Sequence, residues 1–72
     1  MRVFKIKKSG ILYKVYEGLK NASGLIVEWK YIGDTLYNYQ AYAYVRQNGR
    51  EYDPSIDRVA KVWGGYGYYM YK

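Results

Sequence analysis

The chain has no cysteine, no histidine, a single proline and no long apolar run. Without cysteine it has neither a disulfide nor a thiolate metal site, and without histidine it lacks the commonest metal ligand and general base. No stretch of about eighteen apolar residues is present, and the lysine-bearing N-terminus has no signal-peptide core. We therefore expect a cytoplasmic, intracellular protein with no membrane span, no metal and no other cofactor.

Acidic residues are also few: six oppose twelve basic residues, which gives a net charge of +6 and a pI near 9.5. Carboxylates without a histidine partner form no recognisable catalytic set here, so we expect no enzymatic activity and no catalytic residues. The positive balance favours a polyanionic partner such as DNA or RNA. Tyrosine is in large excess, at twelve of 72 residues, and tyrosine suits both strands and interfaces.

Alternation of apolar and polar residues predicts strands along most of the chain, and 72 residues leave room for a single domain, 1–72. The first strands are expected at 2–8, 11–17 and 25–32. Ser9-Gly10 is expected to turn the first hairpin, with Ile6 opposite Tyr13 and Lys5 opposite Lys14. The lysines of that hairpin then share one face of the sheet.

The longest two-residue period runs from Leu36 to Tyr52 and contains Asn48-Gly49, a dipeptide typical of type I′ hairpin turns. We expect a long, central strand here that folds back at this turn. A three-residue loop, Gly33-Asp34-Thr35, is expected to join it to the preceding strand. Ala41 and Ala43 leave space on one face of this strand for another element to pack closely.

One helix is predicted at 56–63. Asp53 suits its N-cap and Pro54 its first position, while Ile56, Val59, Ala60 and Trp63 recur at helical spacing and Gly64 suits its end. Asp53 and Asp57 are spaced like two metal ligands, but we interpret them as a cap and an exposed face.

The predicted fold is therefore α+β: an antiparallel sheet of about five or six strands, the last at 66–71, with one short helix in the C-terminal half packed on one face. The residues predicted to form the core are Phe4, Ile6, Val15, Val27, Trp29, Ala41, Ala43, Val45, Ile56, Val59 and Trp63.

The segment IDRVAKVW, from Ile56 to Trp63, resembles the segment that leads into the DNA-binding hairpin of small crenarchaeal chromatin proteins. The likeness is carried chiefly by Lys61-Val62-Trp63. The preceding segment, YAYVRQNGREYD, is similar to the first hairpin of those proteins. The resemblance implies an SH3-like β-barrel as the alternative fold.

On the predicted sheet, the face away from the helix gathers cations and tyrosines. Cations that follow a phosphate backbone, interleaved with rings on which bases stack, are what binding of single-stranded nucleic acid requires. We therefore predict a small, basic nucleic-acid-binding module, single-stranded or weakly sequence-specific. The residues predicted to form its site are Lys5, Lys7, Lys14, Tyr16, Lys30, Tyr42, Tyr44 and Arg46.

Two other interpretations stay open. Lysine and tyrosine are common on a solvated outer sheet face, where they have no binding role. Tyrosine-rich surfaces also form protein interfaces, so the chain is alternatively a protein-interaction module, such as a viral-type inhibitor or a self-associating structural protein. An exposed edge strand and the tyrosine-rich tail 66–71 are the contact surface expected in that case.

Overall fold

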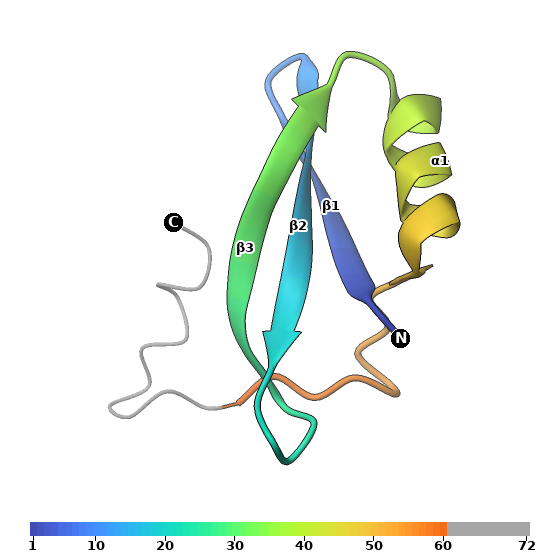
Figure 1. Cartoon of the computed structure of the whole chain (residues 1–72). Coiled ribbons are helices and arrows are strands. Elements are labelled where there is room, and N and C mark those ends of the chain that lie inside the picture. Colours follow the sequence, from blue (N-terminus) through green and yellow to red (C-terminus); the bar gives the residue numbers. More distant parts are fainter. Residues whose placement is uncertain (61–72) are drawn as a thin grey trace.

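The computed structural model describes residues 1–60, which form one sheet and one helix (Figure 1). The sheet has the order β3-β2-β1-β4, in which β1–β2 and β2–β3 are antiparallel and β4 is parallel to β1. The elements are β1 (Val3–Ser9), β2 (Leu12–Lys20), β3 (Ile26–Thr35), α1 (Asn38–Asn48) and β4 (Arg50–Glu51).

The predicted α+β class is confirmed, but the details of the sheet are not. Within residues 1–60 the sheet has four strands and is mixed, whereas about five or six antiparallel strands were predicted. A helix covers one side of this sheet (Figure 1). Residues 1–60 therefore form a four-stranded sheet with a helix and not the SH3-like barrel that was the alternative.

β1 and β2 form the predicted hairpin, but their register differs from the expected one by two residues. The loop is Gly10-Ile11, with Ser9 opposite Leu12, instead of Ser9-Gly10. Gly10 has a φ of +60°, and a positive φ at the first loop residue is what a type II′ turn requires. Because side chains alternate with a period of two, this shift leaves the side chains of the hairpin on their predicted faces.

β2 and β3 form a second antiparallel pair and are longer than the sequence predicted. The loop between them is held by Asn21, whose side-chain oxygen accepts hydrogen bonds from the backbone N–H groups of Ser23 (2.9 Å) and Leu25 (3.1 Å). The predicted loop Gly33-Asp34-Thr35 is wrong, because these residues pair with Tyr13–Val15 as the last part of β3.

Most of the segment 36–52 forms the helix α1 and not the predicted central strand. Ala41 and Val45 lie one helical turn apart and are buried against the sheet, and Tyr44 and Asn48 are half-buried on the same side. This spacing is the apolar stripe of an amphipathic helix. The alternation of tyrosine and alanine over 41–44 imitates a strand, but the helix is favoured because it buries Ala41 and Val45 together.

Asn48-Gly49 ends α1 and does not turn a hairpin. The Gly49 N–H donates to the Val45 carbonyl oxygen (2.8 Å), and the Asn48 side-chain amide donates to the Tyr44 carbonyl oxygen (2.8 Å). Glycine directly after a helix is as typical as glycine in a tight hairpin turn. The chain then enters β4, where Arg50 N–H donates to the carbonyl oxygen of Arg2 (3.0 Å).

The helix predicted at 56–63 is absent from its described part, residues 56–60. Asp53 does cap a short turn, because its Oδ1 accepts hydrogen bonds from the N–H (2.9 Å) and the hydroxyl (2.7 Å) of Ser55. Asp57 is buried and not on an exposed face: Arg50 Nη1 (2.7 Å) and the Asp53 N–H (2.9 Å) donate to its Oδ2, and Arg50 Nη2 donates to its Oδ1. Both carboxylates therefore have structural roles.

After this turn the chain is extended and bridges to the start of β3. Ile26 N–H donates to the Arg58 carbonyl oxygen (2.9 Å), and Ala60 N–H donates to the Ile26 carbonyl oxygen (2.8 Å). The segment crosses below β2 and β3 in Figure 1. The rest of the predicted helix, including Trp63, and the predicted strand 66–71 lie outside the described residues.

The core consists of two clusters, one on each face of the sheet. On the face covered by α1, Phe4 and Val15 pack with Ala41 and Val45. On the opposite face, Tyr52 and Val59 pack against buried residues of β1–β3, so the segment after β4 covers one end of that face. The buried residues of this second cluster are Val3, Tyr16, Ile26 and Trp29.

The predicted core is confirmed for Phe4, Val15, Trp29, Ala41 and Val45, which are buried, and in part for Ile6, Ala43 and Val59, which are half-buried. It is wrong for Val27 and Ile56, which are 38% and 68% exposed. Val3, Tyr16 and Ile26 are core residues that the sequence did not reveal, because two sheet faces are partly covered where a single covered face was predicted.

Candidate nucleic-acid interface

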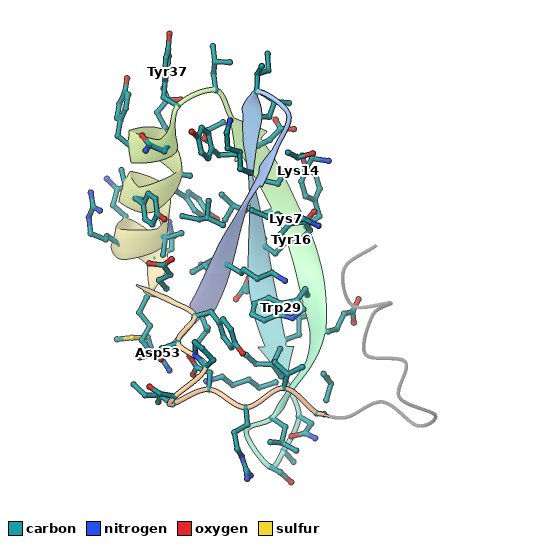
Figure 2. All side chains as sticks on the ribbon, turned by 180° about the vertical axis from the view of Figure 1, so that it is seen from behind. Lys7, Lys14, Tyr16, Trp29, Tyr37 and Asp53 are labelled. Atoms are coloured by element: carbon teal, nitrogen blue, oxygen red, sulfur yellow. The ribbon has the colours of Figure 1, made fainter. Side chains whose placement is uncertain are left out.

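The hairpin of β1 and β2 places three lysines on the sheet face opposite α1. Lys5 and Lys7 alternate with the buried Phe4 and with Ile6, which point toward the helix, and Lys14 lies directly opposite Lys7 in the register. Figure 2 shows Lys14, Lys7, Tyr16 and Trp29 following one another along the sheet. We call this surface the lysine face; its residues are Lys5, Lys7, Lys14, Tyr16, Trp29 and Tyr31.

Aromatic rings lie beneath the ammonium groups of Lys5 and Lys14. Lys5 Nζ is 4.5 Å from the centroid of the Trp29 ring and 5.8 Å from that of Tyr16. Lys14 Nζ is 5.9 Å from the Tyr31 ring, and the rings of Tyr16 and Tyr31 are 5.7 Å apart. A cation within about 6 Å of an aromatic ring is attracted to it, so the rings help to hold the lysines in place.

The surroundings of Lys5 also change its acidity. Burial of its ammonium group, with a smaller contribution from the charge of Lys7, lowers the pKa of Lys5 from 10.5 to about 8. Lys5 is half-buried and Lys7 is exposed. Lys5 therefore holds its positive charge at a desolvation cost that an approaching anion would offset.

The carboxylates that form ion pairs within residues 1–60 lie away from the lysine face. The ion pairs within residues 1–60 are Arg2–Glu17, on the other side of the sheet, and Arg50–Asp57, beside β4. Asp34 lies opposite Lys14, and its Oδ2 accepts a hydrogen bond from the Tyr31 hydroxyl (2.9 Å). Lys7 and Lys14 take part in neither of those ion pairs.

Four of the eight predicted site residues are together on this face: Lys5, Lys7, Lys14 and Tyr16. Tyr16 is only 8% exposed, so its ring serves the core more than the surface. The structure thus supports the strand pairing on which this half of the prediction was based.

The other four predicted residues lie elsewhere. Lys30 is opposite Glu17, on the side of the sheet that carries Phe4. Tyr42, Tyr44 and Arg46 are on α1, because their segment is helical and not a strand of the sheet. Tyr44 packs edge-on against Phe4, with ring centroids 5.6 Å apart, whereas Tyr42 and Arg46 point outward.

The chain was compared with protein-family models, curated proteins and solved structures. Nothing matches it. The resemblance of 56–63 to the crenarchaeal chromatin proteins therefore has no counterpart in these comparisons.

The sequence prediction missed two aromatic rings that contact the lysines, those of Trp29 and Tyr31. Trp29 was predicted to belong to the core, and Tyr31 was not among the predicted site residues. Gly18, opposite Trp29, was the available signal. A glycine within a strand leaves room for a large neighbour, and a Cβ atom at Gly18 would lie 3.2 Å from the Trp29 ring. Gly18 was instead taken as the start of a loop.

The rest of the described chain offers no second chemical site of comparable definition. A pocket of about 190 Å³ lies on the helix side of the sheet, lined by Val15, Ile32, Gly33, Asp34, Thr35 and Tyr44. Within residues 1–60, no group of three or more acidic side chains is placed to hold a metal ion. In the same range, α1 is too short and too polar to cross a membrane.

Proposed function

We propose that the protein is a small, non-enzymatic module that binds nucleic acid through the lysine face. The observation that carries this proposal is the convergence of Lys5, Lys7 and Lys14 on one side of a three-stranded region, over aromatic rings. The net charge of +6 adds a long-range attraction to any polyanion.

The chemistry of the face favours the phosphate backbone over base edges. A lysine ammonium is a compact point charge, and it lacks the planar fork with which arginine reads guanine. In many nucleic-acid-binding proteins a helix reads a groove. Here α1 lies on the other side of the sheet from these lysines (Figure 1). Binding is therefore expected to depend strongly on salt and only slightly on sequence.

The test compares two double variants of equal net charge. Lys7→Gln/Lys14→Gln removes two charges from the lysine face, and Lys30→Gln/Arg46→Gln removes two exposed charges away from it. Fluorescence anisotropy with labelled DNA at about 50 mM salt measures the affinity of each. The first variant is expected to bind about a hundredfold more weakly, because it loses two phosphate contacts and each loss weakens low-salt binding by about tenfold. The second should stay within about threefold of the wild type.

Equal losses in the two variants would mean that only total charge matters and would remove the lysine face as a site. Wild-type binding no tighter than millimolar at low salt would reject the function itself.

A second candidate is a protein-interaction module, favoured by exposed rings at the start and outer side of α1. Leu36, Tyr37 and Tyr39 are 50%, 53% and 63% exposed, and the rings of Tyr37 and Tyr39 stack at 5.7 Å. Exposed tyrosines are enriched at protein interfaces. Light scattering over a concentration series tests self-association. If the chain self-associates, Tyr39→Ser/Tyr42→Ser should abolish the association. A strict monomer at all concentrations counts against this candidate.

A further inference from the structure

The form of nucleic acid that suits the lysine face can be inferred from which of its rings are exposed; this step rests on the proposed function. Recognition of single strands depends on rings that stack on unpaired bases. Trp29 and Tyr16 are 5% and 8% exposed, so no base can lie flat on either ring. The Trp29 ring also meets the edge of Tyr52 at 5.2 Å and the ammonium of Lys5 at 4.5 Å.

Tyr31 is the one ring of the lysine face that is well exposed, at 49%. Its hydroxyl is bonded to Asp34, and the Lys14 ammonium lies 5.9 Å from its ring. A single platform can hold one base, whereas binding along a strand requires successive platforms.

The two tyrosines of residues 1–60 that are more than half exposed, Tyr37 and Tyr39, cannot serve the same strand. Tyr37 directly precedes α1, and Tyr39 lies in its first turn. In Figure 2, Tyr37 is above the helix, away from Lys7 and Lys14. The Tyr37 and Tyr39 rings are stacked on each other with an interplanar angle of 22°. Within residues 1–60, the well-exposed rings other than Tyr31 are thus on a different surface from the clustered lysines.

What the lysine face offers to a nucleic acid is therefore chiefly the positive charge of its lysines. Lys5 and Lys7 are two residues apart on β1, and Lys14 faces Lys7 from β2. A duplex carries one phosphate per 1.7 Å of its axis, about twice the linear charge density of one strand. A cluster of ammonium groups that has few exposed rings beside it for bases to stack on therefore gains more from a duplex.

From this arrangement we propose that the preferred ligand of the lysine face is the phosphate backbone of a double-stranded nucleic acid. The lysines neutralise backbone phosphates, while Tyr16 and Trp29 support Lys5 from below and do not contact bases. DNA and RNA duplexes both carry this phosphate backbone, so binding to each of them is measured separately.

The experiment measures anisotropy of the full chain with a labelled mixed-sequence duplex of about 20 base pairs and with each of its single strands, as DNA and as RNA. Log affinity should fall against log salt with slopes near −0.9 per phosphate contact on duplex DNA and near −0.7 on single strands. With three contacts, duplex DNA should be favoured by about sixfold at about 50 mM salt. Tighter binding to either duplex than to its own strands supports the proposal.

Tyr31 provides an internal control. Tyr31→Phe removes the hydroxyl that bonds Asp34 but keeps the ring, and Tyr31→Ala removes both. The two variants should bind each single strand within about twofold of each other. A loss of tenfold or more that appears only in Tyr31→Ala would show that the ring stacks on an unpaired base and would overturn the proposal.

Equal or tighter binding to single strands would also overturn the duplex preference and leave the proposed function intact. Failure to bind any of the duplexes or single strands would reject both. Because the main comparison uses the wild-type chain, it does not depend on the folding of a variant.

Discussion

Lys7 and Lys14 lie directly opposite each other in the β1–β2 hairpin, so two positive charges face one another across the strands. Neither side chain belongs to the ion pairs within residues 1–60. Like charges in such a pair destabilise a sheet, and the proposed function supplies the reason for keeping them: a phosphate between the two ammonium groups relieves the repulsion.

The first prediction is that removing one of these charges stabilises the free protein. Lys7→Gln should raise the free energy of unfolding by about 0.2–1 kcal/mol. Lys7 is chosen because it faces Lys14, whereas Lys14 also faces Asp34 on β3. Lys30→Gln is the matched control with the opposite sign, because Lys30 lies opposite Glu17 and its loss removes a favourable pair. Urea unfolding of both variants checks this, and a destabilised Lys7→Gln variant would contradict the expected repulsion.

The second prediction concerns pH. Bound phosphate favours the charged form of Lys5, whose pKa in the free protein is lowered to about 8. Affinity for nucleic acid should therefore fall as pH rises from 7 to 9, with proton uptake on binding near pH 8. Lys5→Arg, which stays charged, should be flat over this range. Calorimetry in two buffers of different ionisation enthalpy measures the uptake, and none in the wild type would contradict the role of Lys5.

The third prediction is a loss of stability in acid through Asp57. The hydrogen bonds from Arg50, more than that from the Asp53 N–H, hold the pKa of Asp57 below its ordinary value of 3.8. A lowered folded-state pKa means that the stabilisation is present above 3.8 and is lost as pH falls through the folded pKa. Asp57→Asn should lower the free energy of unfolding at neutral pH by about 1–3 kcal/mol and lessen the dependence below pH 4. Thermal melts from pH 2 to 7 test both effects, and an unchanged acid limb would contradict them.

The fourth prediction concerns the junction of α1 and β4. A Cβ atom at Gly49 would lie 2.1 Å from the carbonyl oxygen of Arg2, which is backbone and cannot yield without moving β1. Gly49→Ala should therefore destabilise the protein by about 1–3 kcal/mol or more. Gly33→Ala is the control, since a Cβ there meets nothing within 4 Å. Chemical denaturation should place the control within about 0.5 kcal/mol of the wild type; similar losses in both would contradict the steric explanation.

The sequence was sufficient to predict the β1–β2 hairpin and the lysines that it presents. Alternation alone placed Lys5, Lys7 and Lys14 on one face, and a register error of two residues did not move them, because the strand period is also two. What the sequence could not settle was which turn residues close the loop. Gly10 suits either position of a two-residue loop, and only the pairing of the strands decides.

The region after β3 was mispredicted because its local signals fit two structures. Asn48-Gly49 is typical of a hairpin turn and equally of a helix end. Ala41 and Val45 carry helical spacing, but the tyrosines between them alternate as in a strand. The helix is favoured because it buries Ala41 and Val45 against Phe4. This tertiary contact is not visible in the local sequence pattern. The error moved Tyr42, Tyr44 and Arg46 onto the sheet face in the predicted site.

The most direct test of the central claim is to map the bound surface by amide chemical-shift changes during titration with duplex DNA. If duplex DNA binds through the lysine face, the largest chemical-shift changes are expected at Lys5, Lys7, Lys14 and Tyr31. The register places these residues close together on β1, β2 and β3. Small changes are expected at Tyr39, Tyr42 and Arg46 on the outer side of α1. Changes concentrated on α1, with β1 and β2 unaffected, would contradict binding through the lysine face.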